Sequence, residues 1–286
     1  MKTKVIIGSF LLMSICSFSQ ENSTENTDNF KNVEKITNKG KFFFYWGWNR
    51  ANYSDSDIHF TGDNGSYDFT LRNVKAKDRQ TPFSFNDYLN PGRITIPQNN
   101  YRIGYFLKEN YTISIGVDHM KYVMVADQTV KIDGEINAGT PFDGVYNNDN
   151  QILSEDFLQL EHTDGLNYVN VEFRRFDEIG HLIGLNHKNF QINLTEGLGA
   201  GILYPRTDVK LFDQERHDEF HIAGYGTSAV IGLDFTFFKY FYIQSDLKFG
   251  YIYMPDVKTT YNPNDGASQS FTFFQRNILI GGRFNL

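Results

Sequence analysis

Apolar and polar residues alternate along about eight stretches of this chain. In the first stretch Phe42, Phe44, Trp46 and Trp48 occupy every second position. Residues two apart lie on one face of a β-strand. The alternating stretches cover 41–49, 101–107, 111–118, 169–174, 190–199, 228–236, 241–253 and 277–286. We expect each of these stretches to lie within a strand of about ten residues or more. Soluble strands average ~5–6 residues and tilted membrane strands need ~9–11, so these lengths favour membrane strands.

The connections between the expected strands alternate between long and short. The first long connection covers about 54–98 and the second about 126–165, whereas 108–110 forms a tight turn. A short hairpin is expected around 58–71. All seven prolines are expected in long connections, because proline cannot donate a hydrogen bond to a sheet. The sequence therefore predicts an all-β fold, a transmembrane antiparallel up-and-down β-barrel with long extracellular loops and short periplasmic turns.

The polar faces of the expected strands carry charges of both signs. The charged residues on these faces are Arg102, Asp118, Glu172, Arg174, Asp234, Asp246, Lys248 and Arg283. Inside a narrow barrel these residues can pair with one another. The apolar faces carry aromatic residues such as Trp48 and Tyr101 near strand ends, as at a lipid–water boundary. The alternative is a soluble, lipocalin-like barrel with the apolar face inward, and the charge pattern favours the membrane barrel.

Glycines share the polar faces with these charges. They are Gly47, Gly104, Gly116, Gly197, Gly199, Gly232, Gly250 and Gly281. The interior of an eight-stranded barrel is just wide enough for side chains, so we expect these glycines to make room for larger neighbours. A pore or a ligand cavity is the alternative interpretation.

The amino terminus and the composition narrow the class of protein further. Residues 1–20 have a charged start, an apolar stretch and a polar end, as a secretory signal peptide has. Residues 21–39 are polar and aperiodic and predict a flexible leader, which leaves 40–286 as the barrel. The chain has 27 Lys and Arg against 34 Asp and Glu, so it lacks a basic footprint for nucleic acid. Its one cysteine, Cys16, lies in the expected signal peptide, so we expect no disulfide after cleavage.

Four segments carry a family resemblance. They are the end of the expected signal peptide, Ser17–Gln20, and then Phe44–Arg50, Gly116–Tyr122 and Ile278–Phe284. With these segments, the chain from about 40 to 286 resembles the OmpA/OmpW-type eight-stranded outer-membrane β-barrels, and more narrowly uncharacterised outer-membrane barrel proteins of the Bacteroidota. The resemblance implies insertion in the cell outer membrane and no established activity.

Two positions depart from the alternation. His119 and Lys121 would face lipid if their strand continued unbent, so we expect a bulge there or a strand that rises above the bilayer. A histidine activated by Asp118 at the rim is the functional alternative for His119. Glu196 lies among apolar outward neighbours and is expected at the membrane boundary or in a bulge.

Candidate chemistry in the sequence is sparse. Outer-membrane phospholipases carry a His-x-Ser element, and none of the seven histidines is followed by serine at that spacing. His217, Glu219 and His221 would share one face of a strand and offer two imidazoles and a carboxylate to zinc. A solvated polar junction is the preferred interpretation of this motif. We therefore assign no catalytic, cofactor-binding or metal residue.

The sequence thus predicts an outer-membrane barrel with a structural or surface-binding role, carried by its long extracellular loops. A lipid-modifying enzyme of the acyl hydrolase or acyltransferase type is one alternative. A narrow porin-like channel or small-ligand carrier is another. The expected partners are outer-membrane lipid and lipopolysaccharide, and a surface partner protein or glycan, without nucleic acid.

Overall fold

The computed structural model describes residues 37–285 except 91, 94, 95, 186, 188, 215 and 216. The expected signal peptide, 1–20, lies outside the described residues, and so does the expected leader from 21 to 36. Apart from Leu286, every residue of the eight expected strands is described.

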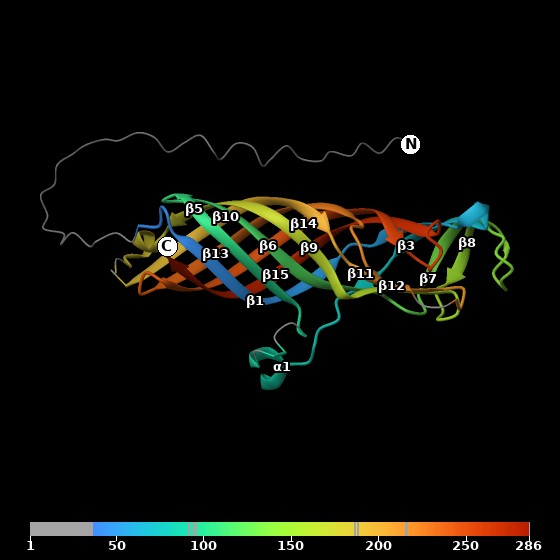
Figure 1. Ribbon diagram of the computed structural model, residues 1–286, viewed down its shortest axis with the longest axis horizontal. Coiled ribbons are helices and arrows are strands. Elements are labelled where there is room, and N and C mark those ends of the chain that lie inside the picture. Colours follow the sequence, from blue (N-terminus) through green and yellow to red (C-terminus); the bar gives the residue numbers. More distant parts are fainter. Residues whose placement is uncertain are drawn as a thin grey trace, which may run out of the picture. The chain divides into compact units, whose positions relative to one another are not determined.

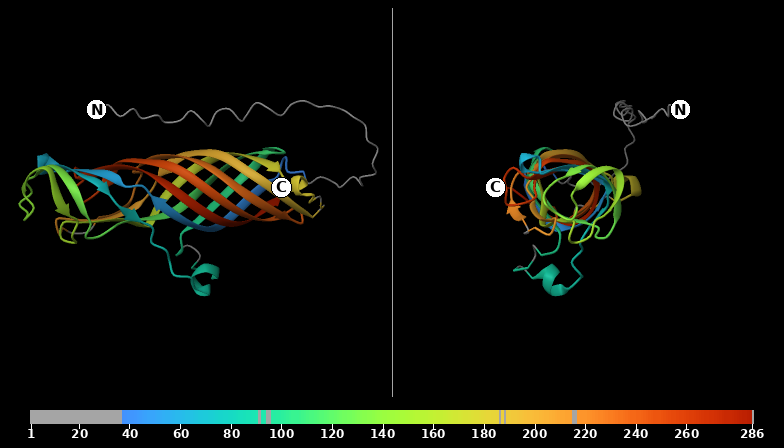
Figure 2. Two further views of the ribbon diagram at one scale, coloured as in Figure 1. Left: turned by 180° about the vertical axis from the view of Figure 1, so that it is seen from behind. Right: turned by 90° about the vertical axis from the view of Figure 1, so that its right-hand side faces the viewer.

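Eight strands of the described chain close into a ring (Figures 1 and 2). They are β1 (Phe42–Tyr53), β5 (Asn99–Lys108), β6 (Tyr111–Met124), β9 (Leu158–Glu178), β10 (Phe190–Leu203), β13 (Gly224–Phe237), β14 (Phe241–Lys258) and β15 (Gly266–Phe284). Each strand pairs with the next in antiparallel register, and β15 pairs back to β1 from Phe42↔Phe284 to Tyr53↔Phe273. The predicted up-and-down barrel of eight strands is confirmed.

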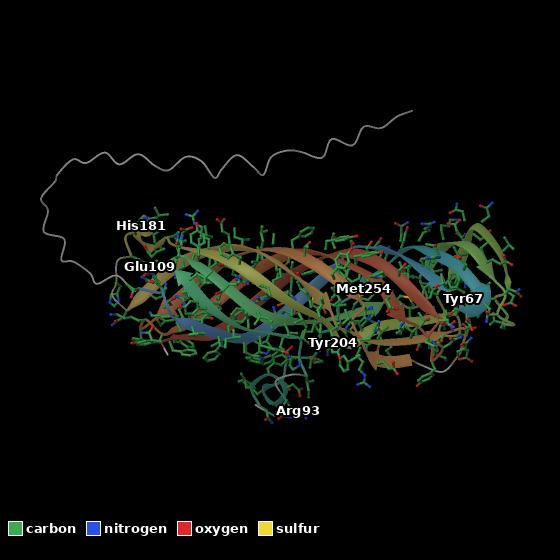
Figure 3. The ribbon with its side chains drawn as sticks, turned by 45° about the horizontal axis from the view of Figure 1, so that its top comes forward. Tyr67, Arg93, Glu109, His181, Tyr204 and Met254 are labelled. Atoms are coloured by element: carbon green, nitrogen blue, oxygen red, sulfur yellow. The ribbon has the colours of Figure 1, made fainter. Side chains whose placement is uncertain are left out.

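Short turns lie at one end of the ring, as the sequence predicts. They are 109–110, 238–240 and the longer 179–189, which contains the 3-10 helix η2 (Gly180–Ile183). Phe238 and Lys239 have φ values of 52° and 72°, the left-handed backbone that lets this three-residue turn reverse the chain tightly. Figure 3 shows Glu109 and His181 together at this turn end, with Tyr67 at the opposite end.

The long connections contain further strands where the sequence predicts loops. In the described residues they form β2 (Ser56–Thr61), β3 (Tyr67–Val74), β4 (Ala76–Lys77), β7 (Thr129–Ile136), β8 (Gly144–Ile152), β11 (Arg206–Leu211) and β12 (His217–Phe220), with the 3-10 helix η1 (Asp63–Gly65) and the helix α1 (Phe85–Leu89). The expected hairpin around 58–71 is β2 and β3. β2 pairs with β15 and β3 pairs with β7, so the first two connections continue the barrel sheet as one body.

The last connection is shorter than the sequence predicts, because β14 and β15 extend to Lys258 and from Gly266. Pro255, expected in a loop, therefore lies inside β14, which corrects the assignment of all prolines to connections. It occupies a bulge, since the pairing with β15 shifts register between Met254 and Val257. A bulge tolerates proline because one residue there makes no ladder hydrogen bond.

The two ends of the barrel bury opposite kinds of residue. In the half next to the short turns, buried positions are polar and exposed positions are apolar. Beyond about Asp118 on β6 and Gly250 on β14 the inward positions become apolar, beginning with Met120 and Ile252. We call this second half, with β2–β4, β7, β8, β11 and β12, the extension. Among the described residues no helix is long and apolar enough to cross a membrane.

Candidate functional site

A network of buried charges fills the ring next to the short turns. Glu172 on β9 lies at its centre, with Oε2 2.7 Å from Arg174 Nε. Its Oε1 lies 2.6 Å from Lys248 Nζ and 3.0 Å from Arg102 Nη2. Three cations from three strands therefore share one carboxylate. The other anions of the network balance this charge.

The other ion pairs of the network each join a cation on one strand to an aspartate on another strand. Arg174 Nη1 lies 2.8 Å from Asp246 Oδ2, and Lys248 Nζ lies 2.5 Å from Asp118 Oδ2. Nearer the turns, Arg283 Nη2 lies 2.7 Å from Asp234 Oδ2. The eight charged residues predicted for the interior are thus all buried and all paired, which confirms their predicted location.

Two glycines show how the interior is packed. A Cβ atom on Gly104 would lie 2.3 Å from the Phe43 ring, and one on Gly250 would lie 2.3 Å from the Phe273 ring. Such distances are impossible for real side chains, so each glycine makes room for an inward-pointing aromatic ring. This supports the packing interpretation of the inward glycines over the pore interpretation.

The outer wall of the same half is apolar. Its exposed residues include Ile103, Ile113, Ile115, Val171, Phe173, Leu198, Ile231, Leu233, Leu247, Phe249 and Ile278. We call this surface the belt. Aromatic pairs lie along its two edges: Phe42–Tyr105, Tyr111–Phe173 and Phe190–Phe237 on the turn side, and Trp46–Trp48, Tyr204–Phe220 and Tyr225–Tyr253 on the extension side.

Buried charge inside an apolar belt reverses the layout of a water-soluble barrel. A continuous apolar surface of this kind is stable in lipid, and aromatic girdles mark where lipid meets water. The chain is an eight-stranded outer-membrane-type β-barrel. In such barrels the short turns face the periplasm, so the extension of this barrel faces the outside.

Comparisons with known proteins add no function to this barrel. No protein-family model matches the chain, and no curated protein matches its sequence. Solved structures similar to it include OprG from Pseudomonas aeruginosa, with a TM-score of 0.37 and 10% identity over 87% of this chain and 98% of OprG. Ail of Yersinia pestis gives a TM-score of 0.32 and 10% identity over 86% of this chain and 99% of Ail. Because these TM-scores are low, the assignment of the chain to the outer-membrane-type barrels rests on the closed ring and the belt.

The expected OmpA/OmpW-type barrel plan is confirmed at the level of the fold. Kinship with Bacteroidota proteins and cleavage of a signal peptide stay predictions.

The extension has an apolar core built from several connections. Phe69 on β3 stacks on Phe60 of β2 with ring centroids 5.1 Å apart. Its ring centroid also lies 6.1 Å from that of Phe157 in the second connection and 5.9 Å from that of Phe212 in the third. One buried side chain therefore joins all three connections. The extension is a packed structure rather than a set of independent loops.

A buried histidine lies within this core. His162 on β9 has Nδ1 2.9 Å from Thr207 Oγ1, and its Nε2 accepts a hydrogen bond of 3.1 Å from the Gln269 side-chain amide. Burial first, and the nearby His221 second, lower the pKa of His162 to about 3. The imidazole is therefore neutral at neutral pH, with its proton on Nδ1.

The rim histidine predicted from Asp118–His119 is not activated by its neighbour. Asp118 points inward to Lys248, whereas His119 points outward, with Nδ1 2.8 Å from Asn167 Oδ1. Adjacent residues of a strand face opposite sides, which separates the two groups. The bulge expected in β6 is wrong, because β6 keeps its alternation through Tyr122 and the extra residues of the register shift beside Met120 lie on β9. β6 instead continues beyond the belt, as the second alternative predicts.

Glu196, the acid among apolar outward residues, lies directly opposite Arg175 in the pairing of β10 with β9. Arg175 Nε also lies 2.8 Å from Asp177 Oδ2, and both of these residues are close to the turn end of β9. These outward charges therefore lie together at the periplasmic edge of the belt, as the boundary interpretation predicts.

The residues considered as zinc ligands lie on and after β12. His221 Nε2 lies 2.5 Å from the backbone oxygen of Asp256, so it is directed towards β14. Glu219 is exposed, and the side chain of His217 lies outside the described residues. Within the described part of the chain, no group of three or more His, Cys, Asp or Glu side chains could hold a metal ion.

Proposed function

We propose that this protein is a surface-binding protein, in which the barrel holds a rigid extracellular head, the extension, for recognition of a partner protein or a surface glycan. The observation that carries the proposal is the apolar core that Phe69, Phe157 and Phe212 form from three connections. Closing a barrel needs hairpins of only a few residues, and long connections that are ordered usually serve binding.

The filled interior favours this role over transport. The charged side chains that point inwards are buried and paired, and aromatic rings occupy the space above the inward glycines. A water-filled channel needs polar groups that contact water along its length. The interior of this barrel instead supports a structural role for the ring.

The positions of the described histidines give little support to a lipid-modifying enzyme. A nucleophilic serine needs a histidine within hydrogen-bond reach and a third group that orients it. His119 is hydrogen-bonded to Asn167 and His162 is buried between Thr207 and Gln269. None of these three hydrogen bonds involves a serine.

Site-specific photo-crosslinking in intact cells tests the proposal. Val145 on β8 is 78% exposed and lies in the extension, whereas Phe238 is exposed in a short turn. A crosslinking residue at 145 is expected to give one discrete, saturable adduct, and the same residue at 238 provides the matched control. No adduct at 145, together with no change in association or phenotype after protease removes the extension, would mean that the barrel is a structural envelope protein.

A further inference from the structure

A segment between β4 and β5 leaves the barrel and lies outside its wall. Figures 1 and 2 show α1 beside the ring strands, at the height of β1 along the barrel axis rather than beyond the extension. We call the described residues of 79–97, which leave out 91, 94 and 95, the excursion. Figure 3 shows Arg93 at the side of the excursion away from the wall. As far as they are described, residues 79–97 take no part in the closed ring or in the core of the extension.

The two ends of the excursion are tied together where it leaves the sheet. The Asp78 carboxylate accepts a 2.9 Å hydrogen bond from the backbone of Ala51 on β1, and it also accepts hydrogen bonds from the side chains of Gln80 and Gln98. Gln80 in turn donates to Gln98 at 2.6 Å. This clamp holds the base of the excursion against β1.

Two contacts hold the excursion against the outer wall. The Tyr88 ring of α1 lies 5.9 Å from the Trp48 ring, centroid to centroid, at the extension-side edge of the belt. Lys121 on β6 donates a 3.1 Å hydrogen bond to the backbone oxygen of Ile96. The excursion is therefore continuous with the belt at the level where the aromatic girdle begins.

The excursion exposes large apolar side chains. Phe83 and Phe85 are 70% and 74% exposed, although their rings contact each other at 5.4 Å, and Leu89 is also exposed. At the base of the excursion Arg79 pairs with Glu161 at 2.6 Å, and the other two charged residues of the excursion, Asp87 and Arg93, pair at 2.8 Å and cancel in charge. Exposed aromatic residues without net charge are costly in water and stable at a membrane interface.

We propose that the excursion is a lipid-contacting foot, whose Phe83, Phe85 and Leu89 side chains enter the acyl chains of the outer leaflet beside the barrel. Its irregular backbone needs water or headgroups as hydrogen-bond partners, so the backbone lies at headgroup level and the three side chains point below it. Contact with Trp48 places the foot at this depth, because tryptophan marks the boundary. The foot enlarges the lipid contact on the β1–β5 side of the barrel, and this inference is independent of the proposed binding function.

Fluorescence quenching in reconstituted vesicles tests the foot. Trp46 and Trp48 are the two tryptophans of the chain, so W46F/W48F gives a background free of tryptophan emission while it keeps an aromatic ring at 48 beside Tyr88. F85W in that background places one tryptophan on the foot, and V145W is the matched control on the extension. Each protein is reconstituted in phosphatidylcholine vesicles, with or without bromine atoms on the acyl chains, and is also titrated with aqueous iodide.

Brominated chains are expected to reduce the emission of F85W by about twofold or more and to leave V145W almost unchanged, because bromine quenches only at short range within the bilayer. Aqueous iodide should quench the emission of V145W strongly and that of F85W only weakly. If iodide quenches F85W as strongly as V145W, and brominated lipid quenches neither, the excursion lies in water and the proposal is wrong. If F85W does not give the folded barrel, which migrates differently on gels before and after boiling, F83W is used in its place.

Discussion

Lys248 on β14 and Glu172 on β9 meet inside the barrel, with Nζ 2.6 Å from Oε1, although β10 and β13 lie between their strands in the sheet. Asp118 on β6 contacts the same ammonium group at 2.5 Å. The pair therefore crosses the lumen rather than following the sheet. Charges that meet across a narrow barrel hold its opposite walls together.

Glu172→Gln is expected to destabilise the barrel by about 3–5 kcal/mol, because it leaves Arg102, Arg174 and Lys248 short of a buried counter-charge. Urea unfolding in detergent micelles measures the change. Asp177→Asn, which breaks a half-exposed pair with Arg175 at the periplasmic edge, is the matched control and should cost no more than about 1 kcal/mol. Equal losses for the two variants would show that the interior pairs add no stability.

Folded protein in planar lipid bilayers is expected to give no stepwise ion conductance. The reason is that the paired interior charges are buried and Phe43 and Phe273 fill the space beside Gly104 and Gly250. Detergent without protein sets the background. Reproducible conductance steps that scale with salt concentration would instead support the channel alternative.

Phe69→Ala is expected to cost about 3–5 kcal/mol and to loosen the extension alone, because Phe69 packs against three connections. Limited proteolysis should cleave the extension faster, while the slower migration of boiled protein on gels, which reports the closed ring, is retained. Thr70→Ala on the opposite face of β3 is the control and should behave like the native chain. Loss of heat-modifiability in the Phe69 variant would contradict an extension that unfolds independently of the ring.

Gly47→Ala is expected to hinder ring closure, because its Cβ would lie 2.1 Å from the carbonyl oxygen of Ile278 on the facing strand. The backbones of β1 and β15 must approach closely at this seam, and a backbone atom cannot move aside as a side chain can. The fraction of heat-modifiable barrel after refolding measures closure. In the control Gly282→Ala the nearest atom, 3.2 Å away, belongs to the movable Phe44 ring, so near-native yield is expected.

The extension is expected to lose stability in acid through His162, which lies outside the belt. Its pKa is about 3 in the fold and ~6.5 in the unfolded chain, so below ~6.5 the unfolded state takes up a proton that the folded state does not. Stability should therefore be unaffected at neutral pH and fall by about 1.4 kcal/mol per pH unit from ~6.5 towards 3. His162→Gln should remove this slope, and protease resistance of both proteins across the pH range gives the difference. Parallel pH profiles for the two proteins would contradict a neutral buried imidazole.

The alternation of residues determined most of the ring by itself. A period of two assigns every residue of a strand to one of two faces, so Arg102 and Lys248 could be placed inside the barrel and Trp48 and Ile278 outside it. Each of these positions agrees with the structure. The residue types on the two faces also indicated a membrane environment. Charged residues on the inward face and aromatic residues on the outward face do not suit a water-soluble barrel of this width.

Only the tertiary structure decided which charges meet and where along the barrel the inward-facing residues change from polar to apolar. The alternation within a strand is a local property of the sequence. The contact of Lys248 with Glu172 depends instead on the curvature of the ring. The pairing of Tyr67 with Ile136 joins two separate connections. The inward face is polar up to Asp118 on β6 and apolar from Met120, because the solvent outside changes from lipid to water at that height. A bulge beside Met120 interrupts the pairing at the same point. The sequence shows the break in the pattern, but the reason for it is the position of the strand along the membrane normal.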